Sequence, residues 1–254
     1  MSHHLRRALE GVFRAVAREG DREETANEEI EVRVGYYDEH GKHFVSNMGR
    51  ESFSKVLKAL HSNANWAETH NYRVQDFYRS DLPEIRLSRK DYDAKQSGGE
   101  SGEQEVCIRK TRRQVFDLPR YGHGSNWGVR VSWCTEAELG MGGEPQELER
   151  FRQEGAHYLR RKHRQSFVHV NRYGMRWHFD ATVVDTSEEE EEEPIKDKDE
   201  DHGDHLYEVE IEVAVPVARL AIMTESEIAY LAHSTQLKVQ DILEIVTQRE
   251  GARV

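Results

Sequence analysis

The segment Tyr207-Glu-Val-Glu-Ile-Glu-Val213 places glutamates at every second position, at Glu208, Glu210 and Glu212. On a β-strand, residues two apart share a face, so this segment predicts one acidic face and one apolar face. Carboxylates in register repel one another unless a cation lies among them. A divalent metal suits such a site, because Mg²⁺ and Mn²⁺ prefer oxygen ligands. For a single run, a solvated strand face is the alternative.

Two further alternating runs argue against a merely solvated strand face. Glu29 and Glu31 repeat the acidic pattern near the other end of the chain. Arg160, Lys162 and Arg164 form a run of the opposite sign, again at every second position. Strand faces with so much charge exceed what an ordinary sheet surface carries, while the other faces of the two acidic runs are apolar and need cover.

The segment 176–184 has the same alternation. Arg176, His178, Asp180 and Thr182 share one face, and apolar side chains occupy the other. A sheet curled into a barrel with its charged face inward would satisfy both faces. Inside it, cations and carboxylates could neutralise one another and bind an anion together with its metal.

The composition fits one large β domain in a reducing compartment. The chain has 254 residues, 36% of them hydrophobic and 33% charged, which is a polar balance for a well-cored globule. A barrel with a polar interior explains that balance, and we expect residues 1–254 to form a single domain. Cys107 and Cys134 provide no disulfide framework. No apolar run approaches transmembrane length, and no signal core is evident, so no membrane partner is expected.

The net charge of −12 is concentrated in one segment. Residues 186–205 hold eleven acidic residues against two lysines, a net −9, which leaves −3 for the remainder. With one isoleucine and no leucine, this segment cannot bury a core, and it is expected to be a disordered acidic loop that acts as a solvated tether. The acidic balance also argues against binding extended duplex nucleic acid by simple electrostatics.

The remaining pattern predicts helices and further strands. Apolar spacing predicts helices over about 4–19 and 50–62, and Thr224 with Glu227 forms a capping box that opens a helix through about Arg249. Ser97–Gly102 is expected to be a loop. The strands are predicted at Glu29–Tyr37, Tyr72–Tyr78, Glu84–Leu87, Glu105–Gln114, Trp127–Glu136, Tyr158–Val170, Met175–Val184 and Leu206–Val215.

Four motifs in this order carry a resemblance to a known family. They are Glu29-Ile-Glu-Val-Arg33, Arg160-Arg-Lys-His-Arg164, Asp180-Ala-Thr182 and Glu208-Val-Glu-Ile-Glu212. The chain resembles the metal-dependent RNA 5′-triphosphatases of fungi and protozoa, which belong to the triphosphate tunnel metalloenzymes. The resemblance spans roughly residues 28 to 215, and the compact length is most similar to the trypanosomatid capping enzymes.

The resemblance implies an α+β fold dominated by an eight-stranded antiparallel β-barrel, the triphosphate tunnel, with flanking helices. It implies hydrolysis of the γ-phosphate of triphosphate-ended nascent mRNA, the first step of cap formation, with Mg²⁺ or Mn²⁺ as cofactor. Glu29, Glu31 and Glu212 match the direct metal ligands. Glu210 and Asp180 match positions that hold metal-bound or attacking water.

Further roles follow from the resemblance position by position. Lys162 and Arg164 match the γ-phosphate clamp, Arg86 resembles a further phosphate-binding arginine, and Glu136 resembles the glutamate that positions the attacking water. Supporting positions on the substrate side are Arg160, Lys110, Thr182, Arg33, Glu208 and Arg176. Asp76 is expected to be another tunnel carboxylate.

Three departures from the family pattern leave alternatives open. Arg33 stands where the wider superfamily usually has lysine, which keeps the charge but loses a compact ammonium. His178 occupies a position where arginine is expected, so either His178 or Arg176 faces the phosphate. Lys110 and Arg109 have opposite strand parity, and the local match favours Lys110 as the inward residue.

Two other functions are compatible with the residues. The same tunnel could hydrolyse inorganic tripolyphosphate or free nucleoside triphosphate. A phosphate-binding module without turnover is the other, although it would gain nothing from the full carboxylate set. The resemblance implies the triphosphate end of RNA as substrate, the guanylyltransferase of the capping pathway as a partner, and a nuclear location.

Overall fold

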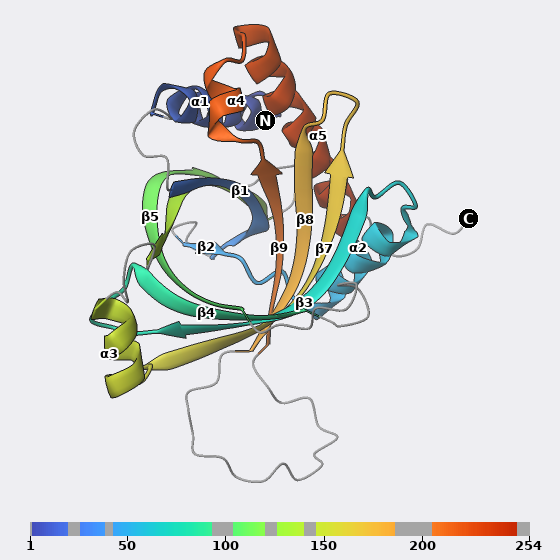
Figure 1. Cartoon of the computed structure of the whole chain (residues 1–254). Coiled ribbons are helices and arrows are strands. Elements are labelled where there is room, and N and C mark those ends of the chain that lie inside the picture. The colour runs from blue at the N-terminus through green and yellow to red at the C-terminus, as the bar shows by residue number, and fades with distance from the viewer. Residues whose placement is uncertain are drawn as a thin grey trace.

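The computed structural model describes residues 2–19, 26–38, 43–92, 104–119, 126–139, 146–185 and 205–247. Their dominant feature is one antiparallel sheet that closes on itself (Figure 1). The strand order is β2-β1-β6-β5-β4-β3-β7-β8-β9, and an additional pairing between β1 and β9 closes the ring. The two-residue β2 pairs only with the end of β1, so eight strands form the barrel, as the sequence predicts.

The strands are long because each spans the barrel wall. Their bounds are β1 Ala26–Tyr37, β2 Phe44–Val45, β3 Glu68–Tyr78, β4 Ile85–Tyr92, β5 Gln104–Leu118, β6 Trp127–Leu139, β7 Tyr158–Val170, β8 Arg176–Asp185 and β9 His205–Ala214. A register shift between Arg112 and Gln114 of β5 marks a bulge. Bulges of this kind increase strand twist and help a sheet to curl.

Helices cover the apolar outer wall. They are α1 Ser2–Glu19, α2 Arg50–Ser62, α3 Gln146–Glu154, α4 Val217–Ala221 and α5 Glu225–Thr247. Leu5, Leu9, Val12, Phe13 and Val16 of α1 are fully buried in one cluster with α5 and the outward residues of β1, β6 and β9. The core of the protein therefore lies between barrel and helices, while the barrel interior is polar.

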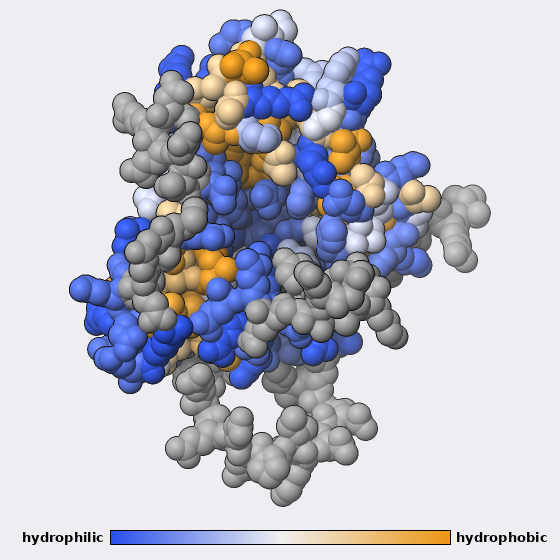
Figure 2. Space-filling view, in the orientation of Figure 1, coloured by the Kyte–Doolittle hydropathy of each residue, from blue (hydrophilic) through white to orange (hydrophobic). Residues whose placement is uncertain are grey.

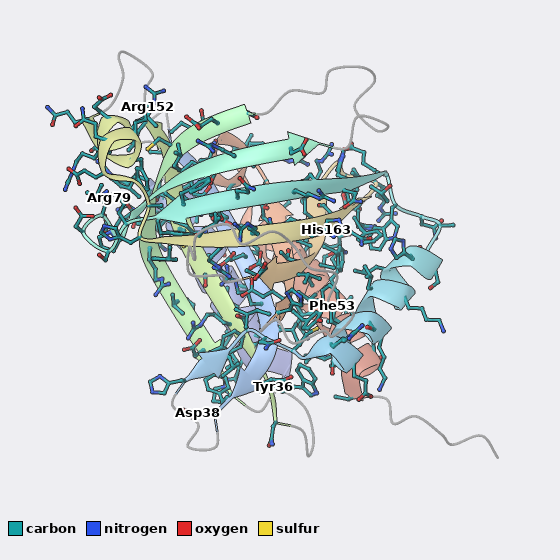
Figure 3. The ribbon with its side chains drawn as sticks, turned by 90° about the horizontal axis from the view of Figure 1, so that it is seen from below. Tyr36, Asp38, Phe53, Arg79, Arg152 and His163 are labelled. Carbon is teal, nitrogen blue, oxygen red and sulfur yellow. The ribbon has the colours of Figure 1, made fainter. Side chains whose placement is uncertain are left out.

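α3 belongs to a smaller, separate cluster. Phe151 packs there against Ile85, Leu87 and Cys107 on the outside of β4 and β5. The buried Arg79 lies at the same corner of the molecule (Figure 3) and donates to the Gly155 carbonyl at 2.7 Å, where α3 has ended. This second cluster anchors α3 to the hairpin between β3 and β4.

Most predicted elements are confirmed, with differences that have physical causes. The capping box is present, because the Thr224 backbone N–H donates to Glu227 at 2.8 Å and the Glu227 backbone N–H donates to Thr224 Oγ1 at 3.3 Å. The strand predicted over Glu84–Leu87 is too short. β4 continues to Tyr92, since near the barrel mouth both of its faces are polar and the alternation disappears.

Three short elements are absent from the sequence prediction, namely β2, α3 and α4. β2 has two residues, and α3 buries only Phe151, so neither leaves a detectable period in the sequence. The loop expected at Ser97–Gly102 lies outside the described residues. So does the acidic segment, except for His205, which begins β9 instead of ending the loop. No helix within the described ranges is long and apolar enough to span a membrane.

Candidate functional site

The acidic strands meet where the barrel closes. Glu31 of β1 lies directly opposite Glu212 of β9, and Arg33 lies opposite Glu210. Directly opposed residues in an antiparallel pair have Cβ atoms about 4.5–5.5 Å apart. Glu29 shares the inward face of β1 with Glu31. Acids from both ends of the sequence therefore face the same lumen.

Cations compensate part of this charge. Glu29 forms an ion pair with Lys110 of β5, and Lys110 also lies 3.3 Å from Glu136 Oε1. Arg33 lies 3.2 Å from Glu31 Oε2 and 2.8 Å from Glu210 Oε1. Lys110 is thus the inward residue, whereas Arg109 points outside and pairs with Glu147 of α3 at 3.0 Å.

Two of the predicted metal ligands have raised pKa values, because their ionised forms are unfavourable in the lumen. Burial, with the charge of Glu31, raises the pKa of Glu29 to about 8. Burial, with the charge of Asp180, raises the pKa of Glu212 to about 7. Glu210 behaves oppositely, because the charges of Arg33 and Arg164 outweigh its burial and lower its pKa to about 2. Glu29 and Glu212 therefore bind a cation or a proton more readily than ordinary glutamates do.

The basic wall, formed by Arg86, Lys162 and Arg164, lies on β4 and β7. Lys162 forms an ion pair with Asp76 of β3, whose side chain is only 2% exposed. Arg86 Nη2 donates to Glu136 Oε1 at 3.0 Å, and Arg86 Nε lies 3.8 Å from Asp76. Asp76 is therefore the tunnel carboxylate expected from the sequence, and it holds Lys162 in place.

Arg164 connects the basic wall to β8 and β9. Its Nη1 donates to Asp180 Oδ2 at 2.9 Å, its Nε donates to Thr182 Oγ1 at 3.1 Å, and Nη2 lies 3.5 Å from Glu210. The carboxylates of Asp180 and Glu210 raise the pKa of Arg164 above its ordinary value, although desolvation opposes this. Asp180 Oδ1 is buried and has no hydrogen-bond partner among the described residues.

The remaining predicted residues lie towards the two mouths of the barrel. Arg160 Nη2 lies 3.5 Å from Glu208 Oε1, which also accepts a hydrogen bond from Ser46 Oγ at 2.8 Å. At the opposite mouth, Arg176 Nη2 donates to Glu68 Oε1 at 2.7 Å. His178, on the same strand face as Arg176, lines the lumen deeper inside.

The lumen contains two cavities. One, of about 550 Å³, contains the basic wall and is lined also by Glu29, Glu136, Asp180 and Glu212. The other, of about 300 Å³, is lined by Glu31 and Arg33 and opens towards the mouth where β8 ends. Figure 2 shows a hydrophilic hollow near the centre of one face, in agreement with a polar interior.

The donor set of the lumen fits a divalent cation. Asp180 Oδ1 lacks a partner within the described structure, Glu31 of β1 lies opposite Glu212 of β9, and the pKa values of Glu29 and Glu212 are raised. Such oxygen donors suit Mg²⁺ or Mn²⁺. As placed, no group of three or more His, Cys, Asp or Glu side chains in the described ranges converges closely enough to hold an ion. Glu29 and Glu31 would have to exchange their lysine and arginine partners for the cation.

Some lumen residues are absent from the sequence prediction. Tyr72, Ser88 and Lys90 line the larger cavity. Ser88 Oγ donates to Asp76 Oδ1 at 2.5 Å and accepts from Arg86 Nε at 3.1 Å, so it fixes both. Ser88 and Lys90 follow Arg86 at two-residue spacing. Extending the β4 strand by five residues would have identified both of them.

Comparisons with known proteins agree with this geometry. The family described as "mRNA capping enzyme, beta chain" matches residues 22–242. No curated protein matches the chain significantly. The triphosphatase of the mimivirus capping enzyme, in its monoclinic structure, is 14% identical with a TM-score of 0.50, covering 92% of this chain and 95% of that chain. This likeness shows a shared fold. A second mimivirus structure, the RNA triphosphatase domain of a trifunctional mRNA capping enzyme, is 12% identical over the same shares with a TM-score of 0.47.

Proposed function

Since the chain belongs to the mRNA triphosphatase family, that of the mRNA capping enzyme beta chain, we propose that its lumen carries out metal-assisted attack of water on the γ-phosphate of RNA. It is an RNA triphosphatase that acts in cap formation. The observation that supports the proposed mechanism is the arrangement of opposed glutamates beside the basic wall in one enclosed lumen.

The basic wall is proposed to bind the γ-phosphate. Phosphoryl transfer leaves little covalent work to a protein, so positioning and neutralisation of the equatorial oxygens dominate catalysis. Arg86 and Arg164 offer guanidinium groups for bidentate contact with phosphate oxygens, and Lys162 offers a compact ammonium. Because these groups are already held by Asp76, Glu136 and Asp180, little reorganisation is needed when phosphate arrives.

The acidic side of the lumen is proposed to hold the cation and the attacking water. Glu29, Glu31 and Glu212 would bind Mg²⁺ or Mn²⁺, which when bound supplies Lewis-acid polarisation of the phosphate oxygens. Glu136 stays an ionised carboxylate, because the charges of Arg86 and Lys110 outweigh burial and lower its pKa. It would orient the water towards phosphorus. Asp180 and Glu210 would hold water from the β8–β9 side.

Six further residues are proposed to support substrate binding, namely Arg33, Lys110, Arg160, Thr182, Glu208 and Arg176. Arg33 and Lys110 each bridge two carboxylates, so they keep the acidic strands from repelling one another. Thr182 fixes the Arg164 guanidinium through its hydroxyl. Arg160 and Arg176 lie nearer the two mouths, Arg160 beside Glu208 and Arg176 beside Glu68.

One assay tests this proposal. Phosphate release is measured from γ-labelled triphosphate-ended RNA, inorganic tripolyphosphate and ATP, with Mn²⁺, with Mg²⁺ and with EDTA. We expect metal-dependent release from RNA, with kcat/KM higher than for the two small substrates. A preference for tripolyphosphate or ATP would favour the tunnel hydrolase of small triphosphates instead. Full activity in EDTA would contradict the metal site.

Three further expectations stay predictions. Guanylyltransferase association is proposed because the diphosphate-ended product is the acceptor for guanylyl transfer, and co-purification of the two proteins tests it. A nuclear location is proposed because cap formation acts on nascent transcripts, and imaging of a tagged chain tests it. The particular similarity to trypanosomatid enzymes also stays a prediction.

A further inference from the structure

Lys90 links the lumen to a hollow on the outside of the barrel. It lines the large cavity that contains the basic wall, and it also lines an outer hollow of about 380 Å³. The outer basic hollow, as we name it, is formed by Arg73, Gln75, Arg89, Lys90 and Asp91. Lys90 thus lies at the rim over which a ligand in the lumen would continue outside.

The strand register explains why these side chains gather. On adjacent strands, Gln75 of β3 lies opposite Arg89 of β4, and Arg73 lies opposite Asp91. Val74 and Asp76 face the lumen, so their neighbours Arg73 and Gln75 face outward. Arg73 also lies opposite His163 of β7, which Figure 3 labels on this wall.

The cations of the outer basic hollow are available for a ligand. Arg73 and Lys90 form no ion pair with any other residue that the structure describes. Arg89 pairs with Glu105 at 2.8 Å but remains 41% exposed, and its guanidinium lies 4.8 Å from the centre of the Phe77 ring. Asp91 is the single acid that lines the hollow among the described residues. The charge balance favours an anion.

The opposite mouth is less suited to a polyanion. Arg130 there is paired with Asp117 at 2.7 Å. Asp185 and His205 end β8 and begin β9 at that mouth, and the sequence between them carries the acidic run of net charge −9. The strand ends at that mouth are thus joined by an acidic sequence, whereas Arg73, Arg89 and Lys90 gather at the other end, so the charge distribution favours exit of a negatively charged chain at the Lys90 end.

We propose that the RNA chain behind the 5′-triphosphate leaves the tunnel past Lys90 and that its first backbone phosphates contact Arg73 and Arg89. This rests on the proposed function, which places the γ-phosphate at the basic wall. Cations on β7, β3 and β4 form a continuous path from the lumen to the outer surface. Lys162 and Arg164 lie inside, Lys90 lies at the rim, and Arg73 and Arg89 lie outside. Single-stranded nucleic acid is commonly bound by a positively charged groove that follows its backbone.

The test compares long and short substrates in one double variant. The Arg73→Ala/Arg89→Ala double variant changes only outward-facing side chains, so its lumen is unaltered. With a triphosphate-ended RNA of about 20 nucleotides, KM is expected to rise about tenfold, and the dependence of kcat/KM on salt to become weaker. With ATP, both kcat and KM are expected to stay at the wild-type values.

Lys58→Ala is the matched control, because Lys58 is an exposed cation on the outer helix α2 and has no ion pair in the described part of the chain. The control is expected to keep the wild-type kcat and KM for both RNA and ATP. An unchanged KM for RNA in the double variant, or an equally raised KM in Lys58→Ala, overturns the proposed exit. Failure of the wild-type protein to act on RNA while it hydrolyses ATP would instead contradict the proposed function.

Discussion

Glu31 and Glu212 lie directly opposite one another across the β1–β9 pairing that closes the barrel. Barrel closure and formation of the acidic site are therefore one structural event. The pairing places two carboxylates in register, an arrangement that is unfavourable without a cation. Because their carboxylates repel one another, Glu31 and Glu212 are expected to contribute more to catalysis than to the stability of the fold.

The first prediction concerns these two glutamates. Glu31→Ala and Glu212→Ala are each expected to reduce phosphate release from triphosphate-ended RNA by about 10²–10³-fold, as expected for loss of a major transition-state contact. The melting temperature of Glu212→Ala should stay unchanged or rise, because like-charge repulsion is removed. Glu147→Ala is the control, since Glu147 lies on α3 and pairs outside the barrel. Retained activity in either lumen variant would contradict the assigned site.

The second prediction tests the cation without an activity readout. A ligand that binds only the folded protein raises the free energy of unfolding, by about 2.7 kcal/mol at a hundredfold excess over Kd. Adding Mn²⁺ should therefore raise the melting temperature of the wild-type protein. The Glu29→Ala/Glu31→Ala double variant should lose this shift, because two of the three proposed ligands are gone. An equal shift in both proteins would place the ion elsewhere.

The third prediction separates charge from geometry at Arg164. Its guanidinium contacts Asp180, Thr182 and Glu210 together, which a single ammonium group cannot do. Arg164→Lys should keep the charge but lower kcat by about tenfold or more, and Arg164→Ala should lower it further. Arg109→Lys is the control on the outer wall. Wild-type kcat in Arg164→Lys would show that charge alone suffices.

The acidic alternation made the barrel predictable from sequence. In Glu208–Glu212 acidic and apolar residues alternate strictly, so the inward residues could be assigned by parity alone. Lys90 could not be assigned in this way, because β4 is polar on both faces near its end. Which side chains form ion pairs across the lumen could not be predicted from the sequence either. That Lys162 contacts Asp76 depends on which strands are neighbours, and no local pattern encodes this.

The fourth prediction concerns the acidic segment. β8 and β9 stay in register up to Asp185 and His205, so a short turn can join them there. Replacing Glu188–Asp201 with a short Gly/Ser linker should leave kcat for ATP within about twofold, because none of the proposed site residues belongs to this segment. A linker of the original length without acidic residues is the control for loop length. A large loss of kcat in either protein would show that the segment takes part in catalysis.

The fifth prediction uses pH to test the buried pair of Asp76 and Lys162. Although burial alone would raise it, the charges of Lys162 and Arg86 lower the pKa of Asp76 to about 2. An aspartate in the unfolded chain titrates near 3.9. The folded pKa is therefore depressed. The stabilisation is present above pH about 4 and is lost as the pH falls towards 2.

Asp76→Asn should lower the free energy of unfolding at pH 7 by on the order of 3 kcal/mol, because it leaves the buried Lys162 charge without its partner. Urea unfolding between pH 7 and pH 3 measures the effect. The difference between variant and wild type should shrink below pH 4, since the wild-type carboxylate then begins to take up a proton. Asp91→Asn, at an exposed acid on the neighbouring strand, should change stability by less than about 0.5 kcal/mol. A difference that is constant over this pH range would mean that Asp76 acts through packing and not through its charge.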